Sequence, residues 1–230
     1  MTAKFTEFYK LVFSGFSKKA DDKQGTGGTV KDIDGNLYHT VTIGTQVWMV
    51  ENLKTTKYKD GTAMPLVTEN ATWGNLTIPG YCEYNNDAAI SIKTYGALYN
   101  KYAITTGKLA PAGWQVVTAA EWALLTKYLG GDSIAGGKIK STGTKEAGTG
   151  LWLDPNTGAT NESGFTAVPA GGRLPDGTFE FGGYRGAWWS SSEVTAINER
   201  GRFTHSDFIL VGIYSFNNNY GLPVRCVRDN

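Results

Sequence analysis

The segment TAAEWALLTKYLGG (118–131) decides the fold class of this chain. Thr118 is a residue type that caps the start of a helix. Glu121 follows at the spacing of a capping box, in which the two residues satisfy each other's backbone N–H groups. The pair Gly130-Gly131 ends the pattern, because glycine is the preferred residue just past a helix. We therefore predict a helix that begins after Thr118 and ends at these glycines.

On the N-terminal side of this helix, residues 29–53 predict two strand runs, with a turn at Asp34-Gly35 between the first pieces. Residues 92–104 have tyrosine and leucine at helical spacing and predict another helix. After residue 131 the chain predicts only short strands and long loops, including residues 136–143 and a hairpin at Asp176-Gly177. Strands, then two helices, then irregular β structure is the order of an α+β fold.

The composition limits the classes of partner. Among 230 residues the formal net charge is +1, so we expect no nucleic-acid partner and no attraction to an anionic membrane. The 30 glycines and many aromatic residues are typical of short strands joined by tight turns. No run of about eighteen apolar residues is present, so no membrane-spanning helix is expected.

Residues 1–16 predict an amphipathic helix with one aromatic face, and residues 17–28 a polar linker. Charged residues such as Lys4 and Glu7 interrupt the apolar run, so we do not interpret this start as a signal peptide. The face of the helix, residues 5–16, is expected to pack on its own domain or on a second copy, or to dock into a larger assembly or at a membrane surface. The main domain is expected at residues 29–230.

We find no motif for catalysis, a metal or a cofactor. His39 and His205 are the only histidines, and neither lies in a nucleophile signature. The segment DIDGN (32–36) lacks the later ligands of a calcium loop, so we interpret it as a turn. We therefore expect no catalytic residue, no bound metal and no cofactor. Cys82 and Cys226 predict either one disulfide or two buried free thiols.

Two adjacent tryptophans, Trp188 and Trp189, lie in a predicted strand. Neighbouring side chains of a strand point to opposite faces. The pair therefore predicts either a sheet that is covered on both faces or a tryptophan that stacks on a ligand.

The segment HSDFILVGIYSFNNNYGLPVRCVRDN (205–230) presents large apolar groups at both parities of a strand. We expect one parity to face the core and the other to form an exposed recognition patch. The members of the core parity are Ile209, Val211 and Ile213. The members of the exposed parity are Phe208, Leu210, Tyr214 and Phe216, and replacing the last two by serine is expected to leave stability almost unchanged. The alternative is that another part of the chain or a partner covers them.

Several segments occur in a recognisable order: IGTQVWMVENL, GYCEYNND, YGALYNKYA, PAGWQVVTAAEWALLTKYLGG, GFTAVPAGGR, WWSSSE and VRCVRD. Together they resemble the fibrobacter major paralogous domain family of bacterial surface proteins, from about Val30 to Asp229. The resemblance implies a C-type lectin-like fold, of the glycine-rich branch that includes formylglycine-generating enzymes.

Related members often carry an asparagine-rich run at the position of residues 198–223. In the variable proteins of diversity-generating retroelements, codons at this position are rewritten, and the resulting side chains form the ligand-facing surface. The resemblance thus implies that this tract binds a ligand. The candidate ligand-binding residues are Arg200, Arg202, Thr204, Ser206, Phe208, Leu210, Tyr214, Phe216, Asn217, Asn218, Asn219 and Trp188.

We therefore expect a non-enzymatic display protein, such as a diversified variable protein, that binds a protein or glycan on another cell or particle. It would lie at the cell surface, outside the cell or on a virion. The alternative is a surface lipoprotein or adhesin with a polysaccharide-binding lectin-like domain. A copper-dependent oxidase of the formylglycine-generating type is disfavoured, because Cys82 and Cys226 lie in different motifs. Relatives often have cysteine at the position of Ala110, so Cys226 is expected to be free or paired with Cys82.

Overall fold

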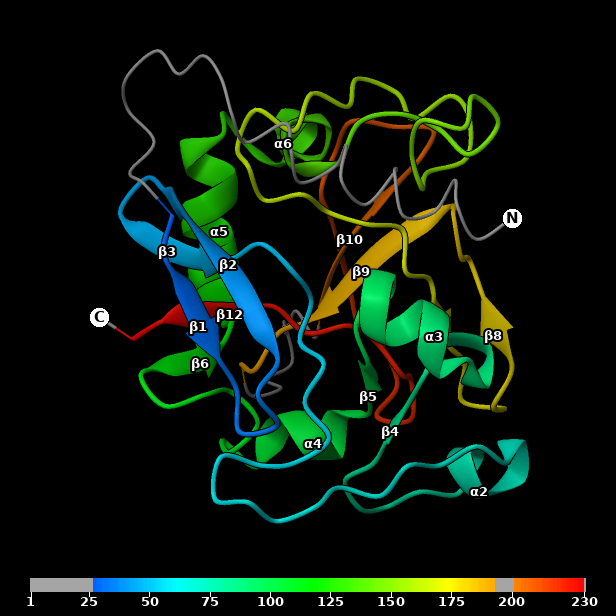
Figure 1. The fold of residues 1–230 in the computed structure, drawn as a ribbon. Coiled ribbons are helices and arrows are strands. Elements are labelled where there is room, and N and C mark those ends of the chain that lie inside the picture. The colour runs from blue at the N-terminus through cyan, green and yellow to red at the C-terminus, as the bar shows by residue number, and fades with distance from the viewer. Residues whose placement is uncertain (1–26, 193–200, 230) are drawn as a thin grey trace.

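The computed structural model describes residues 27–192 and 201–229 (Figure 1). The expected helix at residues 1–16, most of the expected linker and Arg200 lie outside the described residues. The strands are β1 (Thr29–Lys31), β2 (Leu37–Ile43), β3 (Gln46–Met49), β4 (Tyr81–Cys82), β5 (Leu98–Tyr99), β6 (Trp114–Val116), β7 (Gly172–Arg173), β8 (Phe179–Glu180), β9 (Arg185–Trp189), β10 (Gly201–His205), β11 (Gly212–Tyr214) and β12 (Cys226–Arg228). The helices are α2 (Asn70–Gly74), α3 (Ala88–Ile90), α4 (Lys101–Thr105), α5 (Ala119–Tyr128) and α6 (Asp132–Ile139), with a 3-10 turn at Tyr84–Asn86 and a π-helical turn at Ser91–Tyr95.

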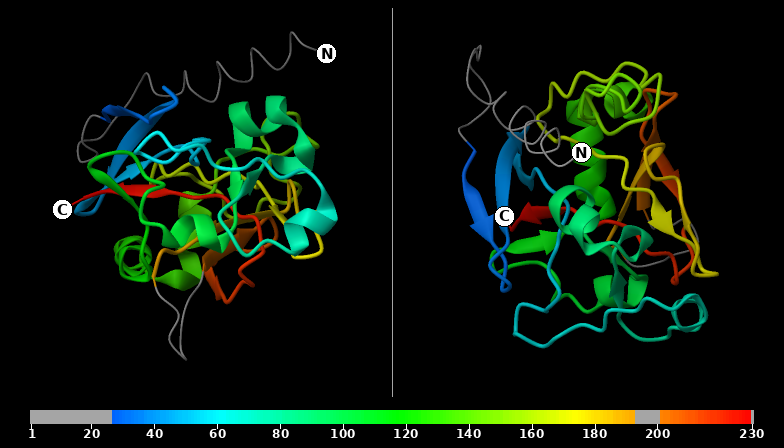
Figure 2. Two further views of the ribbon diagram at one scale, coloured as in Figure 1. Left: turned by 90° about the horizontal axis from the view of Figure 1, so that it is seen from below. Right: turned by 45° about the vertical axis from the view of Figure 1, so that its right-hand side comes forward.

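The strands form two main antiparallel sheets. The larger has the order β1-β2-β3-β12-β6, and the smaller has the order β11-β10-β9. In both views of Figure 2 the sheet of β9 and β10 (yellow to orange) lies on the far side of the molecule from β1 and β2 (blue), with β12 (red) between them. Helices and antiparallel sheets thus follow one another without βαβ alternation, and the fold class is α+β, as predicted.

Helix α5 has the predicted capping box. The backbone N–H of Glu121 donates to Thr118 Oγ1 at 3.3 Å, and the backbone N–H of Thr118 donates to Glu121 Oε2 at 2.8 Å. Gly130 and Gly131 have φ values of 100° and 107°, which lie in the left-handed region that favours glycine. Both local predictions for this helix are confirmed. No helix among the described residues is long and apolar enough to span a bilayer.

Two predicted elements are wrong. Residues 92–104 do not form one helix: a π-helical turn ends at Tyr95, β5 follows, and a separate helix α4 begins after Asn100. Gly96 causes the break, because its φ is +78° and a Cβ there would lie 2.6 Å from Asn52 Cβ. Residues 136–143 begin inside helix α6, where we expected a strand, and the close approach of other backbone segments to Gly136 and Gly137 explains the glycines.

The predicted turns are confirmed. Asp32 Oδ1 accepts hydrogen bonds from the backbone N–H groups of Asp34 (3.0 Å) and Asn36 (2.9 Å), which is an Asx turn and accounts for the DIDGN segment. Leu174 donates to the carbonyl of Thr178 and closes the β7–β8 hairpin around Asp176-Gly177. Within the described ranges, no group of three or more His, Cys, Asp or Glu side chains is arranged to hold a metal ion.

The two adjacent tryptophans belong to different parts of the core. Trp188 packs with Trp48, Trp122 and Phe165, whereas Trp189 packs with a cluster that includes Tyr99 and Phe216. Both are fully buried, so the β11-β10-β9 sheet is covered on both faces at this point. Trp188 is therefore a core residue, and the expectation that it reaches a ligand is corrected.

The cysteines are two buried free thiols. Cys82 packs with Trp73 and Leu98, whereas Cys226 lies in the cluster that contains Trp189. Burial raises the pKa of Cys82 to about 12 and also raises the pKa of Cys226. The disulfide alternative is thus wrong for this structure.

Candidate functional site

Several predicted ligand-binding residues of the C-terminal tract lie in the interior. Arg202, Thr204, Ser206 and Phe216 are at most 2% exposed. Thr204 Oγ1 donates to the carbonyl of Leu210 at 2.8 Å, and the carbonyl of Ser206 accepts from Thr157 at 2.7 Å. These polar side chains and backbone groups hold neighbouring loops in place. The expectation that they face a ligand is corrected, because the fold leaves them no surface.

The expected division of residues 208–216 into two parities is also wrong. Ile209 and Ile213, expected in the core, are 37% and 45% exposed, whereas Phe216, expected outside, is buried. Leu210 and Tyr214 are exposed and Val211 is buried, as predicted. The reason is that residues 206–211 form a loop, and only Gly212–Tyr214 belong to a strand. A two-residue alternation holds only within a strand.

The three asparagines at 217–219 have different roles. Asn219 Nδ2 donates to the carbonyls of Gly74 (2.7 Å) and Leu76 (3.0 Å), and its own carbonyl accepts from Trp73 Nε1 at 2.7 Å. Asn217 Oδ1 accepts from the backbone of Asn219, and the carbonyl of Asn218 accepts from Lys101. Asn217 is exposed, whereas Asn218 and Asn219 are half-buried. Asn219 thus anchors this loop to α2.

One face of the β11-β10-β9 sheet gathers aromatic rings near the surface. The antiparallel register pairs Arg185 with His205, Ala187 with Phe203, and Gly201 with both Trp189 and Tyr214. Directly paired residues project to the same side, so these side chains share a face. We call the following set the aromatic face: Phe181, Tyr184, Arg185, Phe203, His205, Phe208, Tyr214 and Tyr220.

The rings of the aromatic face form two connected groups. His205 lies 4.7 Å from Tyr184, 5.2 Å from Phe203 and 4.5 Å from Phe208, measured between ring centroids. The buried Phe216 lies between Tyr214 (4.9 Å) and Tyr220 (5.2 Å) and forms the floor of the second group. Tyr214 is 53% exposed, and most of the others are half-buried. Such rings offer both apolar surface and polar edges to a ligand.

Charged groups lie among these rings. The guanidinium of Arg185 lies 3.7 Å from the centroid of Phe181 and 6.0 Å from that of Phe216. Tyr184 donates to Asp207 Oδ2 at 2.9 Å, and His205 Nδ1 lies 4.0 Å from Asp207 Oδ1. Burial, and then the charge of Arg185, lower the pKa of His205, while Asp207 opposes the shift. Burial also lowers the pKa of Arg185.

A buried lysine holds the turn that carries His205 and Phe208. Lys140 Nζ donates to the carbonyls of Thr157 (2.9 Å), His205 (3.0 Å) and Phe208 (2.9 Å) and lies over the ring of Trp152. Loss of solvent lowers the pKa of Lys140 to about 8. These three hydrogen bonds fix the backbone on which two rings of the aromatic face stand.

Sequence reasoning found Phe208 and Tyr214. The members of the aromatic face that it missed are Phe181, Tyr184, Arg185, Phe203, His205 and Tyr220. One signal was available for Phe203 and His205, because they alternate with polar residues in the run RFTHS (202–206). Arg185 and Tyr184 could not be found this way, since only the strand register brings them beside His205.

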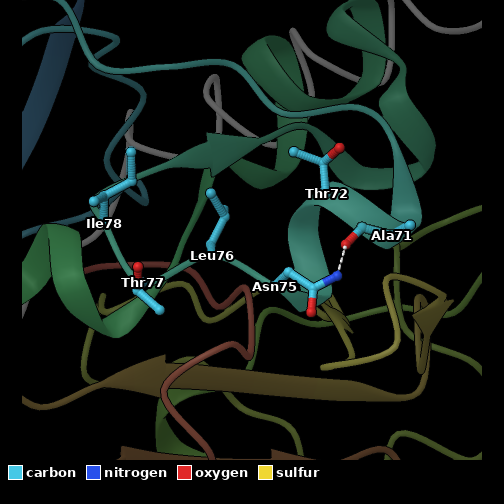
Figure 3. A pocket seen from close by; sticks show the side chains of 6 residues that line it. All are labelled: Ala71, Thr72, Asn75, Leu76, Thr77 and Ile78. Carbon is cyan, nitrogen blue, oxygen red and sulfur yellow. Dashed lines mark hydrogen bonds between the residues drawn. The ribbon is translucent and has the colours of Figure 1, made fainter.

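Shallow hollows also lie on the surface of the described residues, including one beside α2 and one at the junction of α5 and α6. Figure 3 shows the hollow beside α2, with a volume of about 430 Å³, where Asn75 Nδ2 donates to the carbonyl of Ala71 at 2.8 Å. Its other lining residues are Thr72, Leu76, Thr77 and Ile78, so it offers no charged or aromatic group. The second, of about 530 Å³, lies at the junction of α5 and α6 and is lined by Lys127, Asp132 and small residues. The aromatic face has more groups that could recognise a ligand.

Comparison with known proteins identifies one similarity. The family model described as the Fibrobacter succinogenes major domain matches residues 41–228, a range that begins within β2, ends in β12 and includes the aromatic face. No curated protein and no solved structure matches this chain.

Proposed function

Because this chain belongs to the Fibrobacter succinogenes major domain family, we propose that it is a non-enzymatic ligand-binding protein whose binding surface is the aromatic face. The observation that supports this function is the grouping of partly exposed rings around Arg185, His205 and Asp207 at one end of the β11-β10-β9 sheet. Interfaces are enriched in aromatic residues and arginine, and the aromatic rings lose little conformational freedom on binding.

We also propose that the domain is C-type lectin-like, of the glycine-rich branch. Three features support this assignment: the C-terminal strand β12 lies between β3 and β6, helix α5 packs against the same sheet, and long irregular loops fill the second half of the chain. In this arrangement the core lies between the two main sheets, and the aromatic face is on the outer part of the smaller one.

The C-terminal tract is suited to display of variable side chains. The buried side chains of Val211 and Phe216 anchor this tract, and so does the hydrogen bond from the buried Trp73 to the carbonyl of Asn219. The exposed side chains are Ile209, Leu210, Ile213 and Tyr214. Substitution at the exposed positions would change the surface with little effect on the core. The arrangement supports a role as the variable protein of a diversity-generating retroelement, which binds a protein or glycan on another cell or particle. Its place would be the cell surface, the extracellular space or a virion.

A polysaccharide-binding adhesin is the second candidate. It is favoured by the mixture of rings with a guanidinium, an imidazole and the Asp207 carboxylate, since a sugar needs both stacking surfaces and hydrogen-bonding groups. A copper oxidase is not proposed, because Cys82 and Cys226 lie in different core clusters and burial raises the pKa of both thiols. Thiolates, not thiols, bind metals.

The test compares Tyr214→Ser with Tyr128→Ser, in which a tyrosine of similar exposure is removed from α5. Each variant would be measured for binding to a glycan array and to the surfaces of bacterial cells. We expect Tyr214→Ser to lose most of the binding and Tyr128→Ser to retain it. Equal loss in both variants, or full binding by Tyr214→Ser, would contradict the proposal. A reverse transcriptase gene and a near-copy of the C-terminal coding segment beside this gene would favour the diversified protein over the adhesin.

A further inference from the structure

Arg185 and His205 lie directly opposite each other on adjacent strands. The antiparallel register of β9 and β10 pairs their Cα atoms, so the two side chains project from the same face. The lowering of the His205 pKa by Arg185 agrees with this closeness. Two basic groups opposite each other in a sheet destabilise it when both are charged. The two groups repel each other only when His205 is protonated, and an anion bound beside both would offset that repulsion.

Both residues have an unused hydrogen-bond donor or acceptor. Arg185 Nε and His205 Nε2 are covered from solvent and have no hydrogen-bond partner among the described residues. Two buried arginines, Arg173 and Arg225, differ from Arg185 in this respect: Arg173 Nε donates to the carbonyl of Gly177 at 2.8 Å, and Arg225 Nε donates to Asn52 Oδ1 at 2.7 Å. Covered polar atoms in native proteins are nearly always paired. Arg185 is thus held in place by its ring contact with Phe181, and no group among the described residues accepts a hydrogen bond from its Nε.

We propose that Arg185, with His205 beside it, binds the carboxylate of an acidic sugar residue, such as a uronic acid of a polysaccharide. This inference rests on the proposed function of the aromatic face and names the class of its ligand. A guanidinium presents parallel N–H groups that match the two oxygens of a carboxylate. The ring of Phe181 fixes the plane of that guanidinium before the ligand arrives, which lowers the entropic cost of binding.

The surroundings favour a sugar over an acidic peptide. Asp207 lies beside His205 and, although it accepts from Tyr184, has further oxygen lone pairs for hydroxyl donors. A uronic acid offers hydroxyl donors to Asp207, a carboxylate to Arg185 and an apolar C–H face to the rings of Tyr184 and Phe208. Asp207 repels the carboxylate of either ligand, but a glutamate side chain brings no hydroxyl donors to Asp207 that would offset this repulsion.

Binding is expected to strengthen as the pH falls. The charged groups around His205 are Arg185 and Lys140, which lower its pKa, and Asp207, which raises it; burial lowers it most. His205 is therefore neutral near pH 7. A bound carboxylate favours the charged imidazole, so binding takes up a proton. Affinity for a uronic acid should rise as the pH falls from about 7 to about 5, where the sugar carboxylate stays ionised.

The experiment follows the His205 side chain by NMR in ¹⁵N-labelled protein during titration with D-glucuronate and D-galacturonate. Methyl β-D-glucoside is the neutral control. We expect both uronates to shift the imidazole signals and to raise the pKa of His205, whereas the glucoside does neither. Arg185→Gln should weaken uronate binding about tenfold or more, because it removes the charged donor. Arg228→Gln, a change of an exposed arginine on the other sheet, should leave it unchanged.

Three results would overturn the inference. The uronates could leave His205 unperturbed, the glucoside could act as strongly as the uronates, or a glutamate-rich peptide could bind through Arg185 in their place. None of these results removes the proposed function, which depends on the loss of array or cell-surface binding in Tyr214→Ser. If Tyr214→Ser lost array or cell-surface binding and the uronates had no effect on His205, the aromatic face would still be the binding site, but its ligand would belong to a different class.

Discussion

Phe216 and Tyr214 are neighbours with opposite roles. Their ring centroids are 4.9 Å apart, yet Phe216 is 1% exposed and Tyr214 is 53% exposed. Phe216 also packs edge-on against Trp189 at 5.9 Å. We expect Phe216→Ser to lower the free energy of unfolding by about 4 kcal/mol, since it removes a buried ring and leaves a cavity with a hydroxyl in it. Tyr214→Ser should change it by less than about 1 kcal/mol.

Urea denaturation of the two variants checks this difference. The expectation drawn from the sequence, that both residues can become serine without loss of stability, holds for one of them only. If Phe216→Ser unfolded at the same urea concentration as the unchanged protein, the ring would not be part of the core.

Asp34 makes stability depend on pH. Burial alone would raise the pKa of the Asp34 carboxyl. Hydrogen bonds instead lower this pKa to about 2, and they come from the Thr56 backbone (2.6 Å), from Lys57 and from the Thr55 and Thr56 hydroxyls. A carboxyl whose pKa is lower in the folded state stabilises the fold above its unfolded pKa, near 4, and loses this effect as the pH falls towards 2.

We therefore expect Asp34→Asn to lower the free energy of unfolding at pH 6 by roughly 1 kcal/mol, allowing for solvent screening of a partly exposed ion pair. Near pH 2 the difference in stability between the variant and the unchanged protein should be much smaller, because about half of the Asp34 carboxyl is then protonated in the folded state. The measurement is urea denaturation at both pH values. Lys57→Met should show part of the same effect, and a variant that is equally destabilised at both pH values would contradict the electrostatic explanation.

At the scale of elements, helix α6 depends on two glycines that packing requires. A Cβ at Gly137 would lie 2.5 Å from the carbonyl oxygen of Gly158, and one at Gly136 would collide with the carbonyl oxygen of Leu210. The backbone of Gly137 also donates to the carbonyl of Ile209 at 3.0 Å. Helix α6 thus supports the loop 206–211 that leads from the aromatic face to β11.

Gly137→Ala should destabilise the protein by about 2 kcal/mol, although alanine favours a helix by about 1 kcal/mol over glycine, because the collision involves backbone that cannot move freely. Ser133→Ala, at an exposed position of the same helix, should change stability by less than about 0.5 kcal/mol. Thermal unfolding of both variants gives the comparison. If Gly137→Ala were more stable than the unchanged protein, the backbone at Gly158 would be able to move away from the new Cβ without loss of stability.

What the sequence could predict depended on how local the signals are. The capping box of α5 and the turns at Asp32–Asn36 and Asp176-Gly177 involve contacts within a few residues, and these were found. The break at Gly96 depends on contact with Asn52, more than forty residues away, and was missed. The aromatic face was found in part, because Arg185 and the preceding Tyr184 lie at the start of β9, which only the strand register places beside β10.

At the scale of the whole molecule, buried cations hold the irregular loops together. Arg173 donates to the carbonyls of Val67, Thr68 and Gly177 and lies over Trp73 and Phe179. Lys140 and Arg225 make the same kinds of contact: each donates to backbone carbonyls and lies over an aromatic ring. Among the described residues, none of these three cations pairs with a carboxylate. Long loops leave many carbonyls outside any ladder, and the cations supply the missing donors.

Arg225 is the cation that links the most distant parts. Its guanidinium donates to the carbonyls of Met49 (2.8 Å) and Phe165 (2.8 Å) and to Asn52 Oδ1 (2.7 Å), which also accepts from Trp188 Nε1 at 2.9 Å. These bonds connect the larger sheet, the loop at residue 165 and the smaller sheet. The arrangement gives a physical reason for the arginine in the VRCVRD segment.

We expect Arg225→Met to lower the free energy of unfolding by about 3 kcal/mol or more, because the carbonyls it binds are buried and would lose their donor. Arg225→Lys should recover only part of this loss, since one ammonium cannot reach acceptors spread around a planar guanidinium. The exposed Arg228, two residues after Cys226 in β12, serves as the control. The stability of Arg228→Met should stay within about 0.5 kcal/mol of that of the unchanged protein. Urea denaturation measures all three variants. Hydrogen exchange should also accelerate first at the backbone N–H of Val117, which donates to the carbonyl of Arg225, and unchanged protection there would mean that this cation does not hold the sheets together.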